Sequence, residues 1–72
     1  MPHKNREDAE KEAKRLGINT SQVVKSDKGY FIAPQGLETR SAKMAYAKCR
    51  ADGGDKEKCA KIAWNIENEI KK

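Results

Sequence analysis

The chain has 72 residues and a mass of 8.1 kDa; 38% of the residues are charged and 36% are hydrophobic. A chain of this length holds one small core and excludes a deep substrate cavity, because it buries only about 60% of its unfolded surface. Sixteen basic residues against eleven acidic ones give a net charge of +5 and a pI near 9.4, so anionic partners are worth considering. The charges form no basic tail or block, and such an interspersed pattern is also that of the ordinary solvated faces of small helices.

No segment of the sequence is apolar enough to predict a membrane helix. The longest uninterrupted apolar runs have only four residues, as at 30–33, whereas a membrane span needs roughly 20 residues. Residues 1–15 are almost wholly polar and contain no apolar stretch of the kind found in secretory signals. We therefore expect a cytoplasmic protein with no membrane partner.

A first helix is predicted over residues 5–16. Asn5 is a suitable N-cap, and Gly17 is a suitable left-handed residue to end the helix. The apolar positions recur with helical spacing at Ala9, Ala13 and Leu16. This stripe is narrow, so we expect the helix to depend on the rest of the chain for its stability.

Residues 22–33 have the pattern of a β-hairpin. Two short apolar runs flank the turn sequence of residues 26–29, in which Gly29 can take the left-handed position of a bulged turn. An isolated hairpin is only marginally stable in water. We therefore expect the hairpin to lie against helices.

Two further helices follow a break at residues 34–36. The second is expected to begin at Thr39 or Ser41 and to end at Gly53, and the third to begin after Asp55. The short connection makes these two helices an antiparallel αα-hairpin. The fold class is therefore α+β, with three short helices and one β-hairpin in the order α-β-β-α-α.

We expect residues 5–72 to form a single small domain, preceded by a flexible tail of residues 1–4. The periodicities of the three helices and the hairpin predict which side chains meet inside it. The predicted core consists of Leu16, Val24, Ile32, Cys49, Cys59, Ile62 and Ile66.

The two cysteines leave two interpretations open. Cys49 and Cys59 fall on the inner faces of adjacent helices, so a disulfide could join these helices. The other interpretation is two reduced thiols that pack as small apolar groups, which is usual in the cytosol. A zinc site is not expected, because it needs four ligands and the only histidine is His3.

The sequence contains no catalytic motif. Phosphate-binding loops, zinc-protease helices and nucleophile elbows are all absent from it. The carboxylate of Glu67 lies four residues before Lys71, an order that supports a helix. We therefore expect a small accessory protein without enzymatic activity, cofactor, metal or small-molecule substrate.

The first functional hypothesis is binding to DNA or RNA. A register that pairs Val24 with Ile32 places Phe31 on the outer face of the hairpin beside Lys25 and Lys28, where it could stack on bases. The opposite register would bury the phenyl ring. The basic flank of the second helix adds three cations that could contact phosphates: Arg40, Lys43 and Arg50.

The second hypothesis is a protein-interaction module or inhibitor. Its anchors would be Tyr30, Met44 and Trp64, since aromatic residues and methionine are enriched at protein interfaces. Trp64 falls at the edge of the apolar face of the third helix, so it could instead cover the core. The burial of this indole ring distinguishes the two roles.

Overall fold

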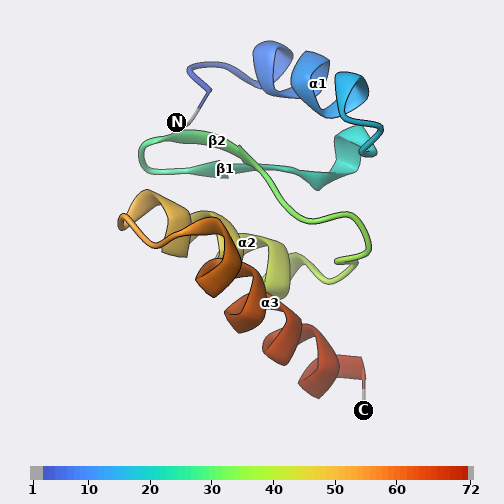
Figure 1. Ribbon diagram of the computed structural model, residues 1–72, viewed down its shortest axis with the longest axis vertical. Helices are drawn as coiled ribbons and strands as arrows, with labels where there is room; N and C mark the ends of the chain where they lie inside the picture. Colours follow the sequence, from blue (N-terminus) through green and yellow to red (C-terminus); the bar gives the residue numbers. More distant parts are fainter. Residues whose placement is uncertain (1–2, 72) are drawn as a thin grey trace.

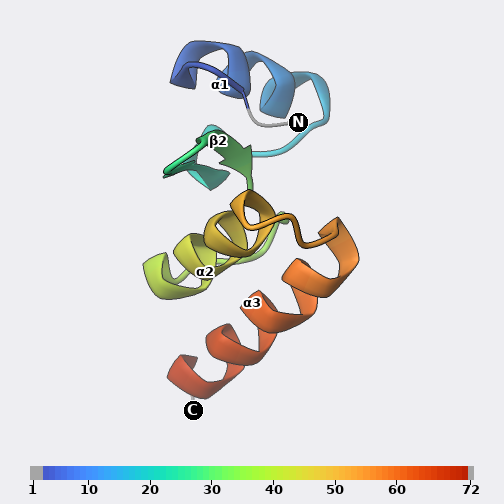
Figure 2. The same cartoon turned by 90° about the vertical axis from the view of Figure 1, so that its left-hand side faces the viewer.

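Figure 1 shows the computed structural model, which describes residues 3–71. Across this range the elements follow the predicted order α-β-β-α-α. They are α1 (Arg6–Arg15), the 3-10 helix η1 (Thr20–Gln22), β1 (Val23–Ser26), β2 (Gly29–Ile32), α2 (Arg40–Ala51) and α3 (Lys56–Lys71). The hairpin lies between α1 and α2, and α3 packs on the far side of α2 (Figures 1 and 2).

Both ends of α1 are formed by the residues that the sequence indicates. The side chain of Asn5 accepts a hydrogen bond of 2.8 Å from the backbone amide of Asp8. At the other end Gly17 has a φ of 75°. The amide of Ile18 then donates to the carbonyl of Ala13 at 2.8 Å, which completes a Schellman motif.

The hairpin register differs from the predicted one. The loop between the strands consists of residues 27–28 alone, without the extra residue of a bulged turn, so Val24 pairs with Phe31 and not with Ile32. A shift of one residue exchanges the two faces of a strand pair. Phe31 therefore points inward, with only 7% of its surface exposed.

Helices cover both faces of the hairpin. On one face Val24 and Phe31 pack against α2, and on the other Val23 packs against Ala9 and Ala13 of α1. This arrangement explains why two consecutive valines are both buried, although successive side chains of a strand point to opposite faces. The larger core cluster contains Val24, Phe31, Ala33, Leu37, Ala42, Tyr46, Ala47, Cys59 and Ala63.

The predicted core is correct only in part. Val24 and Cys59 are buried, and three of its members are half-buried: Ile32, Cys49 and Ile66. Leu16 and Ile62 were expected inside but are exposed by 53% and 40%. The buried stripe of α3 consists of Cys59, Ala63 and Glu67, whose spacing of four residues turns Ile62 outward.

His3 pairs with β2, although we expected it to lie in a flexible tail. Its amide donates to the carbonyl of Tyr30 at 3.0 Å, and the amide of Tyr30 donates to its carbonyl at 2.9 Å. Residues 1 and 2 of the predicted tail lie outside the described residues. His3 thus covers one edge of the hairpin, whereas the outer edge of β1 has no strand partner within residues 3–71.

A disulfide between Cys49 and Cys59 joins α2 to α3, with a Cα–Cα distance of 5.5 Å. Of the two states that the sequence left open, the structure therefore contains the bonded one. Gly53, with a φ of 95°, ends α2 as predicted. Gly54 packs directly against the disulfide: a Cβ atom on it would lie 2.7 Å from the Sγ of Cys49 and 2.8 Å from that of Cys59.

Replacing Gly54 with alanine should lower the free energy of unfolding by about 1–3 kcal/mol, because the added methyl group overpacks the two sulfur atoms. Chemical denaturation of the oxidised protein measures this change. In a Cys49→Ala, Cys59→Ala background the part of the penalty that comes from the sulfur atoms should disappear, whereas the contact of the added Cβ atom with the backbone oxygen of residue 49, at 3.0 Å, should remain.

The matched control for this cycle is Gly17→Ala. A Cβ atom on Gly17 meets nothing within 4 Å, so its cost comes from the φ of 75° alone. That cost should be the same with and without the disulfide. Equal penalties for Gly54→Ala in both backgrounds would show that the sulfur contacts are not the cause.

Candidate nucleic-acid interface

A groove of about 840 Å³ lies between the hairpin and α2. One wall is formed by β1 and the hairpin turn, and the other by one side of α2. In the described part of the chain, six cations line it: Arg6, Lys25, Lys28, Arg40, Lys43 and Lys48. Three carboxylates also line it, those of Asp27, Glu38 and Asp52, so the groove has an excess of positive charge.

The groove brings together four of the six residues that the sequence suggested for nucleic-acid binding. Lys25 and Lys28 come from the hairpin, and Arg40 and Lys43 come from α2. Sequence reasoning missed Lys48, although it follows Arg40 by eight residues, a spacing that places both on one side of a helix. It also missed Arg6, because no local pattern shows that the start of α1 approaches β1.

The other two predicted residues, Phe31 and Arg50, do not line the groove. The guanidinium carbon of Arg50 lies 6.0 Å from the ring centroid of the buried Phe31, a cation–π distance. Arg50 also donates to the carbonyl of Gly54 at 3.2 Å. Our prediction of an exposed stacking ring is therefore wrong, and both side chains take part in packing within the fold.

Most of the groove cations have no carboxylate partner. Within residues 3–71 only Arg6 among them forms an ion pair, with Glu10 at 3.0 Å. Lys43 donates to the backbone carbonyl of Ser21 at 3.3 Å, a contact that links α2 to η1. The remaining charges are accordingly available to an anionic ligand.

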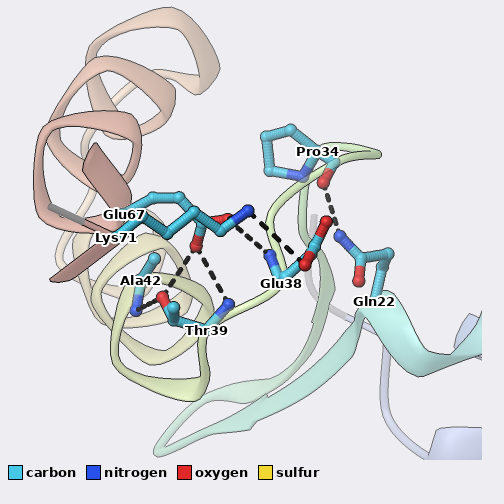
Figure 3. Close-up of polar contacts among 7 residues, drawn as sticks. All are labelled: Gln22, Pro34, Glu38, Thr39, Ala42, Glu67 and Lys71. Carbon is cyan, nitrogen blue, oxygen red and sulfur yellow. Dashed lines mark hydrogen bonds and ion pairs between the residues drawn. The ribbon is translucent and has the colours of Figure 1, made fainter.

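The N-terminal end of α2 is held in place by a buried carboxylate (Figure 3). Glu67 of α3 is only 1% exposed, and it accepts hydrogen bonds from the backbone amides of Glu38 and Thr39, each at 2.9 Å. It also accepts one from the hydroxyl of Thr39 at 2.7 Å. That hydroxyl in turn accepts from the amide of Ala42 at 3.3 Å, so the N-cap of α2 is bonded to α3.

These donors stabilise the charged form of Glu67. The backbone hydrogen bond from Thr39, followed by that from Glu38, lowers the pKa of this carboxyl to about 2, although burial acts in the opposite direction. Lys71 lies 3.2 Å from Glu67 and 3.4 Å from Glu38, and the hydrogen bond to Glu67 raises the pKa of this lysine. Thus Glu67 does more than support its own helix.

The residues suggested for protein binding do not form a single patch. Met44 is exposed within the basic groove. Tyr30 is half-buried and packs against the cluster formed with α1. Trp64 is partly exposed, and its indole ring lies against Gly36, where a Cβ atom would be 3.0 Å from the ring.

Comparison with known protein families, curated proteins and solved structures finds no match to this chain. In residues 3–71 no group of three or more histidine, cysteine or acidic side chains is placed to hold a metal ion. None of the helices described for this range combines the length and apolarity needed to cross a membrane.

Replacing Glu67 with glutamine should lower the melting temperature at pH 7 by roughly 5–10 °C, because an amide cannot accept all three hydrogen bonds. The pKa of about 2 lies below the ordinary value of 4.5. Stabilisation by the native carboxylate is therefore complete above about pH 5 and is lost as the pH falls towards 2. Across this pH range the melting temperature of the variant should therefore change less than that of the native protein.

The control for this experiment is Glu69→Gln, an exposed carboxylate on the same helix. Its removal should leave the melting temperature at pH 7 nearly unchanged. If Glu67→Gln and the native protein lost stability in parallel between pH 5 and 2, the buried carboxylate would not be the group responsible.

Proposed function

We propose that this chain is a small accessory protein without enzymatic activity that binds DNA or RNA through the groove between β1 and α2. The observation that supports this function best is the convergence of cations from two elements on one recess. Lys25 and Lys28 approach it from the hairpin, while Arg40, Lys43 and Lys48 approach it from α2. The two groups of side chains lie on different elements and meet only in the folded chain.

Phosphate groups fit this arrangement chemically. Nucleic-acid backbones carry closely spaced negative charges, and proteins that neutralise them with lysine and arginine release bound counterions. Contacts of this kind position a protein on the backbone without reading the sequence. Binding through the groove is therefore expected to depend strongly on salt and weakly on base identity.

The positions of Tyr30, Met44 and Trp64 favour a nucleic acid over a protein as the partner. A protein interface depends on a few aromatic or apolar anchors that cluster near its centre. Here Tyr30 faces α1, Trp64 lies against Gly36, and Met44 lies among the cations. Met44 could contact sugars in the groove, so it is compatible with the nucleic-acid proposal.

A cytoplasmic location is part of the same proposal, and the disulfide gives a way to test it. Disulfides persist in oxidising compartments, whereas the cytosol keeps most thiols reduced. Trapping with an alkylating reagent at cell lysis would report the state of Cys49 and Cys59. Alkylated thiols indicate a reducing compartment, and a protected disulfide indicates an oxidising one.

Neutralising one cation on each wall tests the proposed function. In the double variant Lys25→Gln, Arg40→Gln, the loss of two phosphate contacts should reduce the slope of log K against log salt by about 1.4 for a single strand. Fluorescence anisotropy with a labelled oligonucleotide at several salt concentrations measures this slope.

The matched control is Lys14→Gln, Lys61→Gln. It removes the same charge from exposed positions of α1 and α3 that do not line the groove. Circular dichroism should show that both variants are folded. Equal losses of affinity in the two double variants would mean that net charge, and not the groove, determines binding.

A further inference from the structure

We infer that the groove takes a single nucleic-acid strand, which it holds by its phosphates and not by its bases. This inference rests on the proposed function and specifies its ligand. Four features of the groove carry it: its shape, its length, the side chains that line it and the open edge of β1.

The shape of the groove favours one strand over a duplex. Its two walls, β1 and α2, are packed against each other through Val24 in the shared core. The groove of about 840 Å³ is therefore a recess in the surface above this contact. A duplex carries its phosphates on a convex surface whose major groove alone is about 12 Å wide, so it cannot follow a recess of this size, whereas a single strand can.

The length of the cationic stretch limits the number of phosphates. At about 3.3 Å per residue the four residues of β1 span roughly 13 Å. Carboxylates limit this stretch: Asp27 in the hairpin turn and Asp52 at the C-cap of α2, with Glu38 just before the start of α2. The hairpin turn and the C-terminal end of α2 lie on the same side of the molecule (Figure 1). Phosphates of one strand are at least about 3.4 Å apart along its axis and farther apart in an extended strand, so about three fit between these limits.

Among residues 3–71, no aromatic side chain lines the groove. Proteins that hold single-stranded bases stack them on exposed aromatic rings. Phe31, the ring that the sequence suggested for this purpose, is buried, and Met44 is the only large apolar side chain on the α2 wall. Bases are therefore expected to point away from the groove without specific recognition.

The open edge of β1 adds a backbone donor. The amide and the carbonyl of Tyr30 both bond to His3, on the side away from β1. In an antiparallel pair the facing residue has the same orientation, so the amide of Lys25 points away from β2 towards the open edge. Within residues 3–71 no other strand takes this position. The amide can donate to a phosphate oxygen whatever the base.

Anisotropy titrations with four labelled probes of about 15 nucleotides test the inference: oligo-dT, oligo-dA, an abasic strand and a duplex. The three single strands should bind within about threefold of one another, and the duplex about tenfold more weakly. For about three phosphates the slope of log K against log salt should be near −2 for a single strand. The Lys25→Gln, Arg40→Gln variant should lose affinity for all three single strands to the same extent.

Each other outcome has a defined meaning. Binding of the duplex as tight as that of oligo-dT would overturn the single-strand inference and leave the proposed function in place. A loss of more than about tenfold with the abasic strand would show that bases are held. No binding of any probe at roughly 20 mM salt, where phosphate contacts are strongest, would refute the proposed function as well.

Discussion

The buried carboxylate of Glu67 is the contact on which the arrangement of the two C-terminal helices depends. It accepts hydrogen bonds from two backbone amides just before α2 and from the hydroxyl of its N-cap, Thr39. A negative charge is favourable here because the first amides of a helix have no intrahelical acceptor and form the positive end of its dipole. The same carboxylate thus caps α2 and positions α3.

The disulfide fixes the opposite end of the same helix pair. Cys49 lies in the last turn of α2 and Cys59 in the first turns of α3, so the covalent bond and the Glu67 contact lie at opposite ends of the antiparallel pair. Between them the helices meet through small side chains such as Ala42 and Ala63, which are fully buried. Small residues allow a close approach but bury little apolar surface. The two end contacts therefore supply much of the specificity of this packing.

Three sides of helix α2 have different roles. It packs against α3 on one side and the hairpin on another, and a third side forms a wall of the basic groove. A wall fixed at both ends holds the backbone that carries its cations at a constant position, which reduces the backbone entropy that a ligand must remove on binding. Arg40 follows directly after Thr39, and Lys48 directly precedes Cys49. The two end contacts therefore stand next to the groove cations that they position.

Local signals predicted the secondary structure well. Three helix ends are determined by the side chain or the backbone preference of a single residue: Asn5, Gly17 and Gly53. No tertiary information was therefore needed to place them. The hairpin register was not predictable in the same way, because residues 26–29 are compatible with both a two-residue and a bulged loop. The difference of one residue decided whether Phe31 was exposed or buried.

The site was predictable only where charge alone identifies a surface residue. Four basic side chains that were expected on the surface do line one groove: Lys25, Lys28, Arg40 and Lys43. Arg50 is equally basic, but it packs over a buried ring that the predicted register had placed outside. One feature of the sequence indicates that Glu67 is buried, its position four residues after Ala63 on a buried stripe. Its role depends on a contact with Thr39, which is 28 residues away.

The most direct measurement of the proposed interface is a titration of the isotopically labelled protein with a short single-stranded oligonucleotide, followed by two-dimensional amide NMR. The amides of β1, the hairpin turn and the groove side of α2 should shift, with Lys25 and Arg40 among the largest changes. The outer face of α3, from Ile62 to Ile70, should remain unperturbed. Shifts centred on Trp64 and the exposed isoleucines of α3, with β1 unchanged, would contradict the assignment of the groove as the binding site.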